Sequence, residues 1–348
     1  MIEASVMIFA YNRDQFLPEA INSVITQLDS DINVEIIVST CFTVSPKFKK
    51  EIQYKQIKFV EFPEGIKYGE QFVKTFDISN GEIIFILEDD DLFLLWKIER
   101  SLAILKSSDD VMFIKDTMES FTNGGDHSII SERLKKSPSD FDLIKIENNY
   151  YTYKKFSRTG VWANPSSMVL RRRIIEENKE VIQCNDPIDI LLAISIFKYD
   201  GYCAIYNSAL TLYRVHTLQD SVSFSSIVDR ESFNRWKKTL YKYSCGYKCL
   251  SKLINNFPFS SKVIYMNYKI VDTLFQEAAY QTKAMNFIFK LIFISLSHLK
   301  DCLLETNQAK FTRLEVLRWY FHFWFELTKY VSFSILYFIR SRSFKDDF

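Results

Sequence analysis

The chain has 348 residues, of which 47% are apolar and 25% are charged, as in ordinary globular proteins. This length suits one large domain with an appendage, or two domains. The formal net charge of +1 gives no reason to expect a nucleic-acid partner, and eight glycines and seven prolines are too few for long disordered linkers.

Short apolar runs alternate with helical patterns through the first part of the chain. An unbroken apolar run predicts a buried strand, whereas apolar residues every three or four positions predict a helix. The succession of strand, helix and strand is typical of a parallel sheet with crossover helices, so we expect an α/β fold. We predict strands at residues 5–9, 34–38, 57–62 and 83–87, and helices at residues 16–28 and 71–78.

The most informative stretch is GEIIFILEDDDLFLLWKIERSLAIL, residues 81–105. Its apolar run predicts a strand buried on both faces, and an acidic run follows without a spacer: Glu88, Asp89, Asp90 and Asp91. Ligands of open α/β sheets bind at the carboxyl ends of the strands. Adjacent carboxylates repel one another, and a divalent cation such as Mg or Mn relieves this repulsion. The alternative is a solvated turn that caps a helix with an apolar face at Leu92, Leu95, Ile98, Leu102 and Leu105.

Several motifs are absent, and their absence excludes classes of protein. No G-x-G-x-x-G follows the first strand and no G-x-x-x-x-G-K-[ST] occurs, which argues against a dinucleotide site and a P-loop enzyme. The six cysteines form no C-x-x-C pair or zinc spacing. The first residues lack a basic leader and an uncharged signal core. We therefore expect reduced thiols and a cytoplasmic location.

Five segments together resemble family-2 glycosyltransferases of the GT-A fold. They are SVMIFAYNRDQFLPEAINSVITQ, NGEIIFILEDDD, NPSSMVLRRRIIEE from Asn164, NDPIDILLAI from Asn185, and YRVH from Tyr213 to His216. Their order and spacing match the family over roughly residues 3 to 225. The resemblance implies a GT-A-like, mostly parallel sheet flanked by helices, and a nucleotide-sugar donor.

The resemblance also implies roles for particular residues. NGEIIFILEDDD matches the segment that ends in the family's D-x-D motif, and YRVH matches the strand end that returns to the metal and the phosphates. The implied donor-binding residues are Ala10, Tyr11, Asn12, Arg13, Ser39, Glu88, Asp89 and Arg214. The implied ligands of a Mg or Mn ion are Asp90, Asp91 and His216. Out of this context, His216 is simply a strand-end histidine.

An acceptor hydroxyl needs a carboxylate as general base, because its pKa is too high for unaided attack. We predict Asp186 for this role, which matches the position of the family's catalytic Asp. Asp186 can also be read as the N-cap of the helix predicted at 188–197, with Pro187 at the first helical position. Asp189 is the nearest competing carboxylate. A single base with direct displacement inverts the anomeric centre.

Two departures from the family pattern lie near the expected donor site. The second strand is followed by Ser39-Thr40-Cys41 where the family carries an acidic pair that reads the nucleobase. Glu88 stands where the first Asp of D-x-D belongs, in the register that fits Lys97. The first departure favours a different hypothesis, namely a catalytically inactive relative that serves as a binding or assembly module. A sugar-phosphate nucleotidyltransferase is a further alternative, but the first turn lacks the glycine-rich loop that it needs.

Residues 226–348 carry only helical patterns, so we divide the chain into a catalytic domain at 1–225 and an all-α C-terminal region. In the tail, apolar and aromatic side chains surround a narrow polar stripe of Arg318, His322, Glu326 and Lys329. These polar groups argue against a membrane span. The aromatic face suits either protein packing or contact with the inner face of a membrane. The expected acceptor is a hydroxyl of a glycan, a protein or a lipid-linked molecule.

Overall fold

The computed structural model describes residues 2–11, 13–28, 32–52, 56–122, 141–147, 152, 155–156, 159, 164–183, 188–216 and 230–253. The chain divides into two compact units, Met1–Thr217 and Leu218–Phe348. The predictions for Asn12, for Asp186 and for the tail beyond residue 253 lie outside the described residues. The sheet and the candidate site belong to the first unit.

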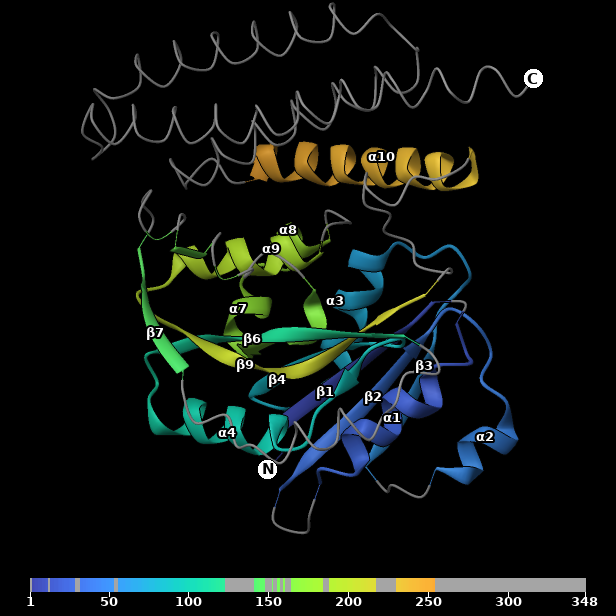
Figure 1. Cartoon of the computed structure of the whole chain (residues 1–348), viewed down its shortest axis with the longest axis horizontal. Helices are drawn as coiled ribbons and strands as arrows, with labels where there is room; N and C mark the ends of the chain where they lie inside the picture. Colours follow the sequence, from blue (N-terminus) through green and yellow to red (C-terminus); the bar gives the residue numbers. More distant parts are fainter. Residues whose placement is uncertain are drawn as a thin grey trace, which may run out of the picture. The chain divides into compact units, whose positions relative to one another are not determined.

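A single mixed sheet forms the centre of the first unit (Figure 1). Its first half is parallel, in the order β3-β2-β1-β4, and consists of the four strands that the sequence predicts: β1 (Ala4–Ala10), β2 (Val34–Thr40), β3 (Ile57–Glu61) and β4 (Ile83–Glu88). The strands that continue it are β8 (Met168–Arg171), β6 (Val111–Thr122), β9 (Gly201–Val215), β5 (Leu92–Phe93) and β7 (Phe141–Ile146). Of these, β8 is antiparallel to both of its neighbours, and β6 and β9 are parallel to each other.

Helices cover both faces of this sheet, as expected for an α/β fold (Figure 1). One face carries α1 (Leu17–Ile25) and α4 (Lys97–Ser107), and the other carries α3 (Tyr68–Ile78), α7 (Arg172–Glu176), α8 (Lys179–Ile182) and α9 (Ile188–Ser195). The short elements are α2 (Pro46–Glu51) and the 3-10 turns η1 (Pro165–Ser167) and η2 (Ile196–Lys198). The second unit contains α10 (Arg230–Leu253). Among the described helices, none is long and apolar enough to cross a membrane.

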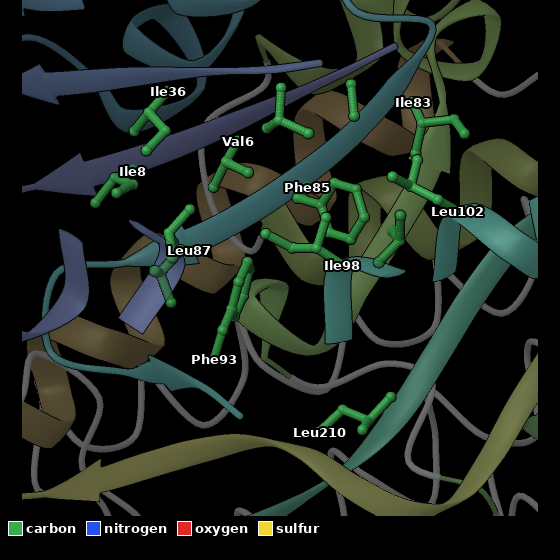
Figure 2. Close-up of a cluster of buried hydrophobic side chains, with 14 of the residues drawn as sticks. Val6, Ile8, Ile36, Ile83, Phe85, Leu87, Phe93, Ile98, Leu102 and Leu210 are labelled. Atoms are coloured by element: carbon green, nitrogen blue, oxygen red, sulfur yellow. The ribbon is translucent and has the colours of Figure 1, made fainter. Parts of the chain in front are cut away.

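The core explains why the central strands are mostly apolar. Alternate side chains of β1, β2 and β4 point toward α1 and α4, where Phe85 packs with Ile98 and Leu102 (Figure 2). The residues between them point to the opposite face, where Phe9 stacks on Phe72 of α3 with ring centroids 5.2 Å apart. Because both faces are covered, most of these side chains are apolar, and the buried polar ones find partners, as where the Ser5 hydroxyl donates to Glu35 Oε1 at 2.7 Å.

The helix after the acidic run begins later than the apolar spacing predicts. Leu92 does not start it but lies in β5, opposite Leu212 of β9. The backbone N–H of Leu94 also bonds to β9, at the carbonyl of Leu210. Trp96 then turns the chain with φ of 67°, and α4 begins at Lys97. Pairing with a distant strand thus overrides the local helical pattern.

Candidate functional site

The acidic run (residues 88–91) lies where β1 and β4 end side by side. Glu88 is the last residue of β4 and pairs with Phe9 of β1. The Asp89 N–H donates to the Phe9 carbonyl at 2.9 Å, and the Tyr11 N–H donates to Asp89 Oδ2 at 3.2 Å. Tyr11 and Asp89 are 78 positions apart in the sequence. Backbone donors therefore hold the turn after β1 and the acidic run together.

Arg13 bridges two members of the acidic run. Its Nη2 lies 2.6 Å from Asp89 Oδ1, and its Nη1 lies 2.6 Å from Asp90 Oδ2. Burial by itself would lower the pKa of the Arg13 guanidinium, but the neighbouring carboxylate charges outweigh it and hold the pKa above its ordinary value. Burial raises the pKa of Asp89 to about 7, against the opposing charge of Arg13. The guanidinium is thus an internal counter-ion of the run.

The end of β9 supplies two further side chains at this edge. His216 Nε2 lies 2.9 Å from Asp90 Oδ2, and its ring packs against Phe16 with centroids 4.8 Å apart. Arg214 donates from Nε to the Asp90 carbonyl at 2.8 Å and from Nη2 to Glu19 Oε2 at 2.5 Å. Arg214 is 2% exposed, so most of its surface is committed to holding the acidic run.

Asp91 faces the protein interior. Its Oδ2 accepts hydrogen bonds from Asn164 Nδ2 at 2.9 Å and Ser166 Oγ at 2.6 Å, and its Oδ1 accepts one from the Arg214 N–H at 3.2 Å. Burial, together with the charge of Asp90, raises the pKa of Asp91 to about 7. Asn164 adopts a φ of 61°, a conformation that asparagine tolerates better than most residues.

Asp189 is linked to this cluster through Asn164. It lies in the first turn of α9, and its Oδ2 accepts the Asn164 N–H at 3.2 Å while Oδ1 accepts the Ile190 N–H at 2.9 Å. Burial raises the pKa of Asp189 to about 6, although these hydrogen bonds oppose the change. Asn164 therefore bridges two carboxylates, Asp91 and Asp189, that are 98 positions apart in the printed sequence.

The remaining predicted residues have separate environments. Burial raises the pKa of Glu88 well above its usual range, and the Tyr68 hydroxyl donates to its carboxylate. Ala10 is fully buried at the end of β1. Ser39 is also fully buried, beneath α3, where its hydroxyl accepts from Gln71 Nε2 at 2.9 Å and Thr75 Oγ1 at 2.8 Å. The structure therefore places the Ser39 side chain inside the protein rather than on the surface of the site.

Asp90 and His216 form the donor set that best fits a divalent cation. A carboxylate oxygen and an imidazole nitrogen meet there, and Mg or Mn at such sites keeps several ligands from phosphate or water. The oxygens of Asp91 already accept three protein hydrogen bonds. Over the described ranges, no group of three or more His, Cys, Asp or Glu side chains has metal-binding geometry. The described side chains thus fit a cation only when phosphate or water completes its shell.

The fold therefore brings most of the predicted site together, and it adds residues that sequence reasoning missed. The missed residues are Tyr68, Asn164, Ser166, Lys97, Asp116 and Thr211. The NPSS motif resembles a segment of the family, but its hydrogen bonds to Asp91 cannot be read from the sequence. The roles of Asp116 and Thr211 had no local signal, because each lies inside a strand whose partner is distant in sequence.

Comparison with known proteins gives a consistent result. An uncharacterized glycosyltransferase from Nostoc sp. is 26% identical over 234 residues, which cover 65% of each chain. Another from Haemophilus influenzae is 25% identical over 230 residues, which cover 62% of this chain and 67% of the relative. The chain thus spans about two thirds of the length of these relatives.

Solved structures show a likeness of fold. The crystal structure of S. aureus TarS 1-349 in complex with UDP-GlcNAc superposes with a TM-score of 0.51 at 10% identity, covering 86% of this chain and 92% of that one. At this identity the likeness concerns the fold alone. The family model for glycosyl transferase family 2 matches residues 5–178, which include β1, the acidic run and the Asn164 loop. The chain belongs to glycosyl transferase family 2.

Proposed function

We propose that the chain transfers a sugar from a nucleotide-sugar donor to an acceptor hydroxyl, with inversion at the anomeric centre. The observation that carries this proposal is the convergence of Arg13, Asp90 and His216 at the carboxyl end of the parallel strands. In open α/β sheets, ligands bind at this edge. Family membership and the UDP-GlcNAc complex of TarS support a nucleotide sugar as that ligand.

In the proposed mechanism, Asp90 and His216 would hold a Mg or Mn ion beside the donor's diphosphate. Such an ion neutralises the negative charge that the leaving diphosphate gains. Asp90 and His216 are the proposed ligands, while Asp91 orients the Asn164 loop through its hydrogen bonds. Arg13 is the cation that we propose for contact with a phosphate, because it lies beside Asp89 and Asp90 at this edge and its side chain is 13% exposed.

We propose that the general base comes from the segment at the start of α9. The acceptor oxygen attacks the anomeric carbon as the bond to the diphosphate breaks, and the carboxylate takes the acceptor's proton. Asp186, the residue that the sequence predicts, lies outside the described residues. Asp189 is described, and two features support it: its hydrogen bond from the Asn164 N–H, and a pKa of about 6, near the value that suits a base at neutral pH.

A binding module without catalytic activity is the second candidate function. It is favoured by Ser39-Thr40-Cys41, which supply no carboxylate to read a nucleobase, and by the burial of the Ser39 hydroxyl under α3. The acidic run, Asp189 and His216 favour an enzyme instead. Turnover of a donor separates these functions, since a binding module would hold a nucleotide without releasing free sugar or product.

The test is turnover of a panel of nucleotide sugars with different bases, with and without Mn. We expect at least one donor to be hydrolysed slowly in the absence of an acceptor. Asp90→Asn should abolish the Mn-dependent part of this activity. The matched control is Glu61→Gln, a carboxylate at the end of β3 that contacts Lys49 rather than the acidic run. If no donor turns over while one binds, the second candidate function is correct.

A further inference from the structure

Lys97, the first residue of α4, carries a charge where none is expected. Its side chain is fully buried, and Nζ donates to Asp116 Oδ2 at 2.5 Å, the Ser166 carbonyl at 2.7 Å and Thr211 Oγ1 at 2.7 Å. Three hydrogen bonds are as many as an ammonium group can donate. Nζ also lies 4.5 Å from the centre of the Phe93 ring. The ammonium thus connects α4, β6, η1 and β9 at one point.

Packing alone does not account for this arrangement. Moving a charge out of water is costly, and well-packed apolar residues often replace a buried ion pair without loss of stability. Burial lowers the pKa of Lys97, although the charge of Asp116 opposes the change. The charged pair therefore calls for an explanation other than stability.

The hydrogen bonds of Lys97 lead directly to the acidic run. The Ser166 carbonyl, which accepts from Lys97, also accepts from Thr211 Oγ1 at 3.2 Å. The hydroxyl of the same serine donates to Asp91 Oδ2 at 2.6 Å and accepts the Glu88 N–H at 3.0 Å. Ser166 is fully buried, and this one residue connects the Lys97 ammonium group to Glu88 and Asp91, the two ends of the acidic run.

We propose that Lys97 is a positioning residue for the donor site: it fixes Ser166, and through Ser166 it fixes Asp91 and the turn that carries the acidic run. The role at the donor site rests on the proposed function, whereas the fixing of the turn does not. Thr211 shares the task, because its hydroxyl accepts from Lys97 and donates to the Ser166 carbonyl.

The test separates positioning from stability by removing both charges together. Lys97→Met alone leaves Asp116 buried without its partner and can fail to fold. The double variant Lys97→Met with Asp116→Asn removes both charges and keeps an oxygen for the Leu210 N–H, which donates to Asp116 Oδ1 at 3.3 Å, so it should melt close to the wild type. We expect the Glu88 amide to exchange with deuterium at least tenfold faster in it, because Ser166 Oγ is no longer held. We also expect kcat/KM for the donor to fall at least tenfold.

The matched control is Arg171→Met. Arg171 lies in β8 and contacts the end of α4 opposite to Lys97. Arg171 is buried and donates to the carbonyls of Leu105, Ser108 and Val111, far along the chain from the acidic run. It should lose stability, but its Glu88 amide should exchange faster only by the factor seen at other core amides, and the surviving folded protein should keep its kcat/KM. Faster Glu88 exchange in Arg171→Met equal to that in the double variant would mean that any loosened helix has this effect, and would overturn the proposal.

A second pair of variants serves if the double variant does not fold. Thr211→Val removes the hydroxyl and keeps the shape, whereas Thr211→Ser keeps the hydroxyl. Faster exchange at Glu88 in the valine variant, with rescue by serine, supports positioning; equal rates in both overturn it. Unchanged Glu88 exchange in a stable double variant also overturns it. A wild type that turns over no donor refutes the proposed function, while the exchange rates still decide the role of Lys97.

Discussion

Replacing Arg13 by methionine should destabilise the first unit far more than breaking a surface ion pair. The Arg13 side chain is 13% exposed, and it faces Asp89 and Asp90 with side-chain exposures of 0% and 9%. Charges about 4 Å apart interact by roughly 4 kcal/mol at an effective dielectric constant near 20. Removing one partner of a buried pair costs roughly 3–5 kcal/mol, because the other charge stays buried.

We expect a cost near the lower end, about 3 kcal/mol, because protonation can partly neutralise the orphaned carboxylates. For a unit of this size, that cost lowers Tm by about 6–12 °C. The assay is thermal unfolding followed by circular dichroism. Added MnCl₂ should recover part of the loss in Arg13→Met, since a divalent cation can replace the guanidinium as counter-ion.

Lys49→Met is the matched control for this experiment. Lys49 Nζ lies 2.6 Å from Glu61 Oε1, the same separation as in the Arg13 contacts, but the two side chains are 35% and 32% exposed. An exposed pair contributes about 0–1 kcal/mol. Equal losses of stability in the two variants would refute the counter-ion role that we assign to Arg13.

Three further predictions concern catalysis and the tail. Asp189→Asn should lower kcat by about 10²-fold or more, the scale of losing a general base, and a comparable loss confined to Asp186→Asn would reassign the base. Because the pKa of Asp189 is raised to about 6, the carboxylate is protonated below that pH, so the kcat of the wild type should fall as pH drops through 6 and level off above it. A chain that lacks residues 312–348 should still bind donor but pellet less with anionic liposomes; equal pelleting would remove the case for membrane contact.

The parallel half of the sheet could be predicted from the sequence because its physical causes are local. The central strand β4 is buried on both faces, so its apolar run is continuous, and the edge strand β3, which carries Lys58 and Glu61, is short and partly exposed. The start of α4 could not be predicted. Leu92 and Leu95 fit the helical spacing, but the backbone from Leu92 to Leu94 pairs instead with β9, which lies more than a hundred residues later.

The candidate site divides in the same way. The acidic run directly after a buried strand is a local feature of the sequence. The sequence alone therefore indicates Asp90 as a candidate ligand. The sequence cannot show that Asp91 turns inward to Asn164 and Ser166, because this depends on how η1 packs beneath β4. Nor can it show that the Ser39 hydroxyl is covered by Gln71 and Thr75. Side-chain direction at strand ends follows from tertiary packing.

The most direct test of the proposed donor site is calorimetric titration of nucleotide sugars into the wild type and Asp90→Asn in the presence of Mn. We expect the wild type to bind at least one nucleotide sugar, Asp90→Asn to bind it at least tenfold more weakly, and Glu61→Gln to bind it like the wild type. Equal binding by the wild type and Asp90→Asn, or no binding of any nucleotide sugar by the wild type, would contradict the account.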